Sequence, residues 1–207
     1  MNLQLDQLLA DTSPNVLKSK RKTMKFLLQA YQAGTPGMNT KPKTDILAKQ
    51  GAFSFHYGCT DPEMRTLTSW LLTNAPSRKK LAKVIPKLWK RHGKEDLKLV
   101  GLLLANLNRE DLKEDPWIVF IHLFNKSEPL ETILEIAEEM NRSENKIPDD
   151  DWLIAMAQQS DLWHQIAMLF ISVRGQGIGE LKQLVTSAPS GGELFEKIRT
   201  NLLKSNT

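Results

Sequence analysis

Residues 78–107, RKKLAKVIPKLWKRHGKEDLKLVGLLLANL, join a lysine-rich segment to an almost continuous apolar one. From Leu97 to Leu107, apolar residues occupy nearly every position around a helix. A helix that is apolar all round must be surrounded by other parts of the protein. We therefore predict that this segment forms a central, buried helix.

Helix-start signals recur on both sides of this stretch. Ser13 followed by Pro14 predicts a capped helix that continues to about Ala33. Thr60, with Glu63 three residues later, predicts a capping box at the start of another helix. Further candidate N-caps are Asp115, Ser127, Asp161 and Ser190.

Strand signals are nearly absent. Phe53, Phe55 and Tyr57 alternate with polar residues, but this short run has no partner hairpin, so we predict a loop between helices. Short turns such as His92-Gly93 predict that consecutive helices lie antiparallel. Pro86 either kinks one helix or starts a second.

The spacing of these signals defines the expected fold class. From Ser77 onward the helices fall into pairs of about 30 to 40 residues, which is the unit length of HEAT-type solenoids. We predict an all-α fold of stacked antiparallel helix pairs, a HEAT-like α-solenoid (α-α superhelix). One domain covers residues 1–207, with residues 1–76 a more divergent N-terminal part. A compact irregular helical bundle is the alternative.

Composition is that of an ordinary globular protein, with 41% hydrophobic and 25% charged residues. No stretch approaches the about 18 uninterrupted apolar residues of a membrane span, and the start lacks a signal-peptide pattern. The single cysteine, Cys59, cannot form an internal disulfide. We therefore expect a cytoplasmic protein with no membrane partner.

No cofactor and no metal are expected. The four histidines, at positions 56, 92, 122 and 164, lie far apart without the spacing of metal ligands. Gly175, Gly177 and Gly179 follow no strand, and Glu180 stands where a dinucleotide-binding loop needs its third glycine.

Charge is divided between the two halves of the chain. Residues 1–98 hold 18 Lys and Arg against 7 Asp and Glu, a net of +11, whereas residues 99–207 hold 10 against 17, a net of −7. A basic half suggests a polyanionic partner, although many basic faces are merely solvated. A second basic cluster precedes the lysine-rich stretch and comprises Lys18, Lys20, Arg21, Lys22 and Lys25, with Lys41, Lys43 and Lys49 after it.

The lysine-rich stretch supplies the candidate nucleic-acid-binding residues. Like charges one helical turn apart repel, so phosphates that neutralise them would explain the cluster. A solvated amphipathic face is the alternative. The candidates are Lys79, Lys80, Lys83, Lys87, Lys90, Arg91, Lys94 and Lys98, with Trp117 and Trp152 as possible groove aromatics. Trp89 and Trp163 are expected to pack in the core.

The runs Leu88-Trp89-Lys90 and Asp96-Leu97-Lys98-Leu99-Val100 resemble a helix pair of the DNA-alkylation-repair family of HEAT-like proteins, the AlkD-like glycosylases. Lys98 stands where that family usually has arginine. Trp117, the run Trp163-His164-Gln165-Ile166-Ala167, and Ile178-Gly179 before Pro189 are similar to later elements of the family. The resemblance covers roughly residues 78–200.

Three positions depart from the family pattern. Ile121 replaces the acidic residue that the resemblance implies for glycosylase catalysis, Ile166 replaces an arginine, and Glu180 replaces a tryptophan. An isoleucine cannot stabilise positive charge that develops on the deoxyribose. The implied glycosylase chemistry is therefore expected to be absent, unless a shifted alignment brings Asp115 or His122 to the site.

Three functions follow from these observations. The first is a non-catalytic or altered alkylation-repair-like protein that binds duplex DNA through a basic surface. The second is a helical-repeat scaffold that binds an acidic protein segment, and its distinguishing feature is the acidic half with Glu131, Glu135, Glu138 and Glu139. The third is an active alkylpurine DNA glycosylase.

Overall fold

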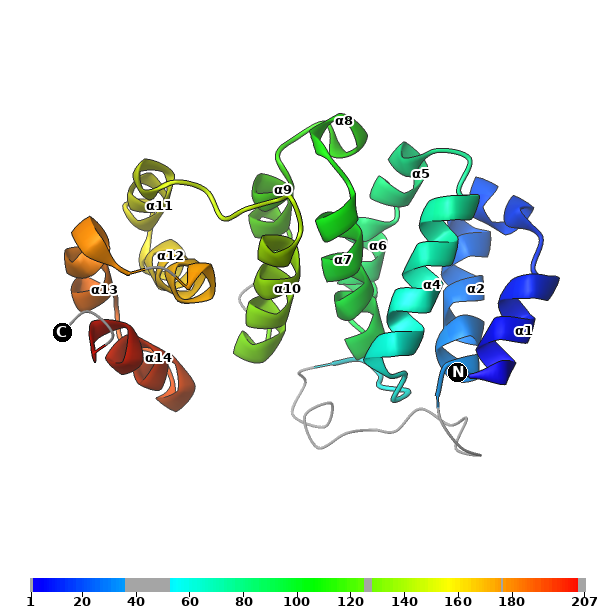
Figure 1. The fold of residues 1–207 in the computed structure, drawn as a ribbon, viewed down its shortest axis with the longest axis horizontal. Coiled ribbons are helices and arrows are strands. Elements are labelled where there is room, and N and C mark those ends of the chain that lie inside the picture. The colour runs from blue at the N-terminus through cyan, green and yellow to red at the C-terminus, as the bar shows by residue number, and fades with distance from the viewer. Residues whose placement is uncertain (1, 36–52, 125–127, 176, 205–207) are drawn as a thin grey trace. The chain divides into compact units, whose positions relative to one another are not determined.

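The computed structural model describes residues 2–35, 53–124, 128–175 and 177–204, and within these ranges every regular element is a helix (Figure 1). The predicted all-α class is therefore confirmed. Ser127 and the lysines at positions 41, 43 and 49 lie outside the described residues. Among the helices that are described, none is long and apolar enough to cross a membrane.

The chain divides into two compact units, unit 1 from Met1 to Thr132 and unit 2 from Ile133 to Thr207. The boundary lies inside α10 (Leu130–Arg142). The helices before it are α1 (Leu3–Asp11), η1 (Pro14–Lys18), α2 (Lys20–Ala33), α4 (Asp61–Asn74), α5 (Arg78–Ala82), α6 (Ile85–Arg91), α7 (Lys94–Asn106), α8 (Arg109–Leu112) and α9 (Pro116–His122). Those after it are α11 (Asp150–Ala157), α12 (Asp161–Arg174), η2 (Gly179–Leu181), α13 (Lys182–Ser187) and α14 (Glu193–Lys204).

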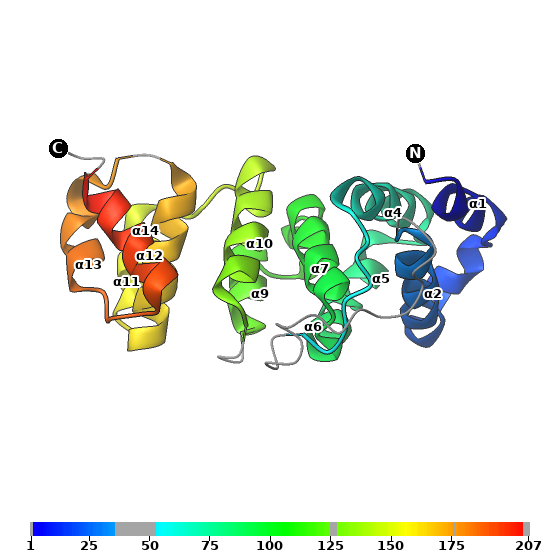
Figure 2. The same cartoon turned by 90° about the horizontal axis from the view of Figure 1, so that it is seen from below.

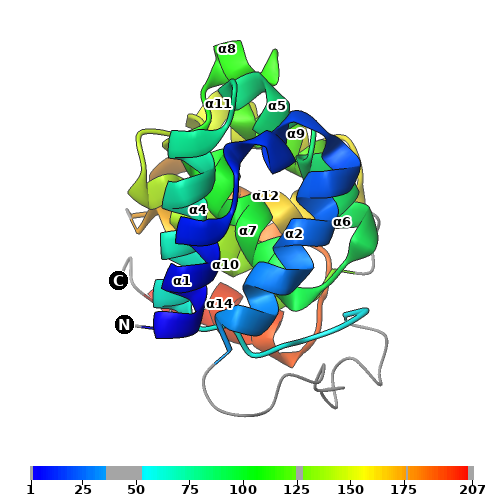
Figure 3. The same cartoon turned by 90° about the vertical axis from the view of Figure 1, so that its right-hand side faces the viewer.

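In unit 1, α1 and α4 lie on one side, and α2 and α6 lie on the other (Figures 2 and 3). Helix α7 packs against α4, α6 and α9. Ten of its 13 residues are buried, and Leu97, Leu99 and Leu104 have no exposed surface. The predicted central, buried helix is confirmed.

Helix starts follow the sequence signals in part. The Ser13 hydroxyl caps η1, and the Asp115 carboxylate accepts from the Trp117 amide at 2.8 Å. Pro86 stands at the start of α6, so it begins a second helix. The capping box at Thr60 is wrong, because the Thr60 side chain makes no capping hydrogen bond.

Three further expectations about helix bounds are wrong. The helix expected to continue from Pro14 is interrupted at Ser19, whose backbone is extended. The Thr23 hydroxyl donates to the Val16 carbonyl at 3.2 Å, and this bond satisfies a carbonyl that the interruption leaves without a helical amide. Helix α12 is capped by Ser160 and not by Asp161, and α14 starts three residues after Ser190.

The segment from Phe53 to Thr60 is a loop, as predicted, and it lies along the turn between α6 and α7. The Ser54 amide donates to the His92 carbonyl, and the Lys94 amide donates to the Phe55 carbonyl. The buried Glu95 carboxylate accepts from the amides of Tyr57, Gly58 and Cys59 at 2.9, 2.8 and 3.3 Å. Side-chain and backbone hydrogen bonds therefore fix this loop to the start of α7.

A buried carboxylate joins α2, α6 and α7. Asp96 has no exposed surface, and its Oδ1 accepts from the Tyr31 hydroxyl at 3.0 Å. The Arg91 guanidinium donates to both carboxylate oxygens, at 2.7 and 2.6 Å, and to the Met24 carbonyl at 2.7 Å. Burial alone would lower the pKa of Arg91, but hydrogen bonds and the charge of Asp96 outweigh it and raise the pKa. The half-buried Arg91 and the fully buried Asp96 therefore form a bidentate ion pair.

The Tyr31 hydroxyl should make the stability of unit 1 sensitive to alkaline pH. Burial and the neighbouring Asp96 charge raise the pKa of Tyr31 well above 10. Above pH 10 the unfolded chain loses this proton while the folded chain keeps it, so the free energy of unfolding falls as pH rises. Relative to Tyr31→Phe, wild-type protein should lose about 1.4 kcal/mol per pH unit above pH 10. Urea unfolding of both proteins from pH 8 to 11 measures this, and a pH-independent difference would contradict it.

Candidate nucleic-acid interface

Five lysines are exposed on α5, on α6 and in the short connection between them. The apolar residues of these helices turn inward, where Leu81, Ile85 and Leu88 are at most 2% exposed. The charged residues between them are left in solvent. We call this set the lysine ridge, and its members are Lys79, Lys80, Lys83, Lys87 and Lys90, all exposed.

No member of the lysine ridge forms an ion pair with a residue that the structure describes. Nearby cations differ, since the Arg78 guanidinium donates to the Asn106 carbonyl at 2.9 Å. The lysine ridge therefore concentrates positive charge that the described part of the fold does not neutralise.

The other three predicted contacts are engaged inside the fold. Arg91 is bound to Asp96 and to the Met24 carbonyl, as described above. Lys98 lies 2.8 Å from Asp61, and the Lys94 ammonium lies 5.9 Å from the centre of the Phe53 ring. These three side chains are half-buried, so the exposed members of the predicted set of eight are the five lysines of the ridge.

The pairing with Lys98 also lowers the pKa of its partner, Asp61. Burial alone would raise the pKa of Asp61, but hydrogen bonds from Lys98 and Arg65 outweigh it and lower the pKa. The Asp61 carboxylate therefore contacts Arg65 of its own helix, α4, and Lys98 of α7.

The second basic cluster lies on η1 and α2. Its described members are all exposed, and α2 lies beside α6 in Figure 3. The hydrogen bond from Arg91 to the Met24 carbonyl links the two helices directly. Unit 1 as a whole holds 21 Lys and Arg against 13 Asp and Glu, a net of +8. Residues on neighbouring helices can thus extend the positive surface of the ridge. The members of this cluster are Lys18, Lys20, Arg21, Lys22 and Lys25.

The two tryptophans predicted to line a groove, Trp117 and Trp152, differ in how exposed they are. Trp117 is only 2% exposed and its ring lies 6.3 Å from Phe120, so its assignment to a groove is wrong. The physical reason is that Trp117 and Phe120 share the face of α9 that packs against the central helix. Trp152 is half-buried on α11. Trp89 packs in the core as expected, whereas Trp163 is only half-buried.

The positions implied for glycosylase chemistry carry no acid suited to it. Ile166 is buried, Ile121 is half-buried, and the exposed carboxylate of Glu180 lies on a different unit from Ile121. Asp115 is used as a helix cap, and the His122 ring lies 3.6 Å from Glu114. The described residues contain no cluster of His, Cys, Asp and Glu that could hold a metal ion.

The single thiol does not suit nucleophilic chemistry. Burial and the charges of Glu95 and Glu63 raise the pKa of Cys59 to about 12. The thiolate is the reactive form, so this side chain is protonated and inert near neutral pH.

No family model, no curated protein and no solved structure matches this chain. The resemblance to the alkylation-repair family therefore stays a prediction from the quoted residues.

The sequence analysis did not predict the carboxylates that pair with Arg91 and Lys98 and so separate these two cations from the exposed lysine ridge. Arg91 lies five residues before Asp96, across the left-handed backbone of His92, and helical spacing alone does not bring these positions together. Tyr31 and Asp61 are distant in sequence from the cations that they help to position. The acidic pair Glu95-Asp96 inside a basic stretch was the signal that could have been used.

The division between the two groups predicts effects of very different size on the free energy of unfolding for two neighbouring substitutions. Arg91→Ala leaves the buried Asp96 charge without its partner and should lower the free energy of unfolding by about 3–5 kcal/mol. Lys90→Ala removes an exposed charge and should change it by less than about 0.5 kcal/mol. Urea unfolding at pH 7 measures both. Equal effects would show that the assignment of Arg91 to the core is incorrect.

Proposed function

We propose that unit 1 binds the phosphate backbone of duplex DNA through the lysine ridge, without catalysis. The observation that carries this proposal is the row of five exposed ammonium groups with no ion-pair partner among the described residues. Exposed like charges repel one another, and phosphates relieve that repulsion. In this proposal the helix pairs of the chain are units of a HEAT-like solenoid of the alkylation-repair type.

The proposed contacts are electrostatic and carry little base information. Flexible lysine side chains reach phosphates as point charges, and binding releases the counterions that the duplex had condensed. The exposed basic residues of α2 would extend the contact along the backbone. Affinity should therefore depend strongly on salt and weakly on base sequence.

Two alternatives are ranked below DNA binding. A protein-binding scaffold is favoured by the exposed carboxylates of Glu131, Glu135 and Glu138 on α10. Glu139 does not belong to that exposed set, since it is buried and lies 3.1 Å from Arg142. An active glycosylase would need an acidic group where this chain has Ile121.

Charge reversal of the ridge should weaken DNA binding selectively. In the double variant Lys87→Glu/Lys90→Glu, the dissociation constant for a labelled 20-base-pair duplex should rise at least about tenfold at 100 mM salt. The slope of log affinity against log salt should become shallower by about 2, because two phosphate contacts are lost. Fluorescence anisotropy at salt concentrations from 50 to 200 mM measures both quantities.

A matched control comes from unit 2, where Lys182 and Lys197 are also exposed. The double variant Lys182→Glu/Lys197→Glu changes the net charge equally and should leave affinity within about twofold of wild type. Equal weakening by both double variants would refute a localised interface. So would the absence of measurable binding by wild-type protein at 50 mM salt.

The same preparations test the absence of catalysis. Wild-type protein mixed with alkylated duplex should release methylated purines no faster than the duplex alone, because Ile121 cannot stabilise the charge of the transition state. Chromatography of the released bases measures this rate. Release that is lost on Asp115→Asn would instead establish an enzyme.

A further inference from the structure

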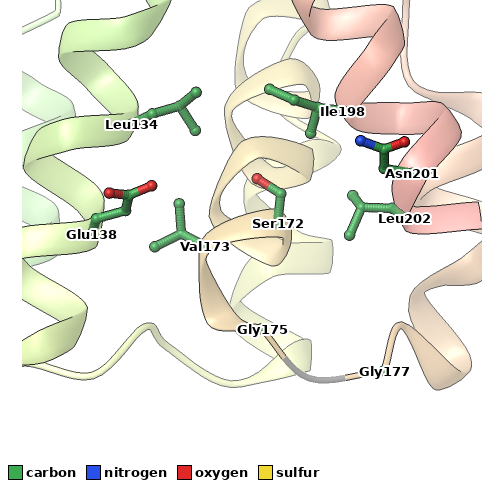
Figure 4. A pocket seen from close by; sticks show the side chains of 9 residues that line it. All are labelled: Leu134, Glu138, Ser172, Val173, Gly175, Gly177, Ile198, Asn201 and Leu202. Carbon is green, nitrogen blue, oxygen red and sulfur yellow. The ribbon is translucent and has the colours of Figure 1, made fainter. Parts of the chain in front are cut away.

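Unit 2 contains a groove of about 480 Å³ between α10, α12 and α14 (Figure 4). Leu134 and Glu138 are one turn apart on α10, and Ile198 and Leu202 are one turn apart on α14. Their side chains point toward each other across the groove, with Val173 of α12 between them. The four apolar side chains are each half-buried, so they form one partly solvated apolar surface.

The polar groups of the groove differ in what they offer a ligand. The Ser172 hydroxyl is already used, because it donates to the Leu169 carbonyl at 2.7 Å. The Glu138 side chain is exposed, and no described residue forms an ion pair with it. Arg142, the nearest cation on the same helix, contacts the Glu138 backbone carbonyl and the Glu139 carboxylate instead. Glu138 is therefore an available negative charge beside an apolar surface.

The charge of the surrounding unit favours a basic ligand. Unit 2 holds 11 Asp and Glu against 7 Lys and Arg, a net of −4, so a phosphate-bearing ligand would be repelled. An apolar ligand without charge would leave Glu138 beside a poorly solvated contact, which disfavours it. A ligand with both apolar and cationic groups would match the apolar side chains of the groove and the Glu138 carboxylate.

The shape of the groove favours a helix over a small molecule. The groove is open to solvent, whereas small-molecule pockets usually bury about 70–90% of their ligand. Its opposing walls repeat at one helical turn, which matches apolar side chains at i and i+4 of an incoming helix. We propose that this groove docks an amphipathic helix of a partner protein, whose apolar row contacts Leu134, Val173, Ile198 and Leu202 and whose Lys or Arg pairs with Glu138.

The proposal can be tested with a phage-displayed library of helical peptides, panned on the full chain. Enriched peptides should carry apolar residues at i and i+4 together with a Lys or Arg. Fluorescence anisotropy of a labelled, enriched peptide should show at least tenfold weaker binding to Glu138→Lys. Replacing the basic residue of that peptide with Glu should restore binding to Glu138→Lys, because the charges are then exchanged.

Two further variants separate the groove from general charge and from misfolding. Glu144 is exposed in the same unit and does not line the groove, so Glu144→Lys should bind the peptide as wild type does. Leu134→Ser should weaken binding at least tenfold, with circular dichroism reporting whether the variant keeps its helical content. Glu138 is at the surface, so Glu138→Lys decides the outcome if Leu134→Ser unfolds.

Several outcomes would overturn the proposal. They are the absence of enriched peptides, enrichment of acidic peptides, and binding that is insensitive to Glu138→Lys. Displacement of the peptide by duplex DNA would assign the groove to nucleic acid. A concentration-dependent dimer that Leu134→Ser dissociates would assign it to a second copy of the chain. None of these results bears on DNA binding by the lysine ridge, whose residues belong to unit 1.

Discussion

The buried carboxylate of Asp96 is the constraint on which the structure of unit 1 depends. It has no contact with solvent, so its charge must be satisfied by the protein, and Arg91 and Tyr31 do so from α6 and α2. An uncompensated charge at this depth would cost several kcal/mol. The consecutive helices α6 and α7 and the sequence-distant α2 are therefore held in one arrangement around a single side chain. Glu95, its neighbour, fixes the loop at Tyr57 by accepting backbone amides.

This arrangement also determines which basic residues remain at the surface. Arg91 forms an ion pair with Asp96, and Lys98 forms one with Asp61, so the charge of each is balanced by a carboxylate of unit 1. The lysine ridge has no such partners among the described residues, and its charge is available to a polyanion. The same stretch of sequence thus supplies both the half-buried cation that pairs with Asp96 and the exposed cations of the proposed interface.

Much of the fold could be predicted because it depends on local patterns. The apolar period of residues 97–107 identified α7, and Asp115 before Pro116 identified the start of α9. Interruptions such as Ser19 were missed because they depend on hydrogen bonds between separate elements. The inward position of Trp117 was missed for a related reason, since periodicity does not show which face of a short helix meets the core. The need for glycine at position 93 could not be predicted either, because it depends on a segment that is distant in sequence. A Cβ atom at Gly93 would lie 2.0 Å from the Phe55 ring.

The groove at Glu138 could not be predicted from the sequence, because three helices contribute to it.

The separation of structural cations from exposed ones concerns residues only a few positions apart. Reductive methylation of lysines, followed by mass spectrometry with and without duplex DNA, tests it most directly. We expect Lys87 and Lys90 to react rapidly in the absence of DNA and to be protected by it, while Lys98 reacts slowly in both cases. Rapid reaction of Lys98, or a ridge that duplex DNA leaves unprotected, would contradict it.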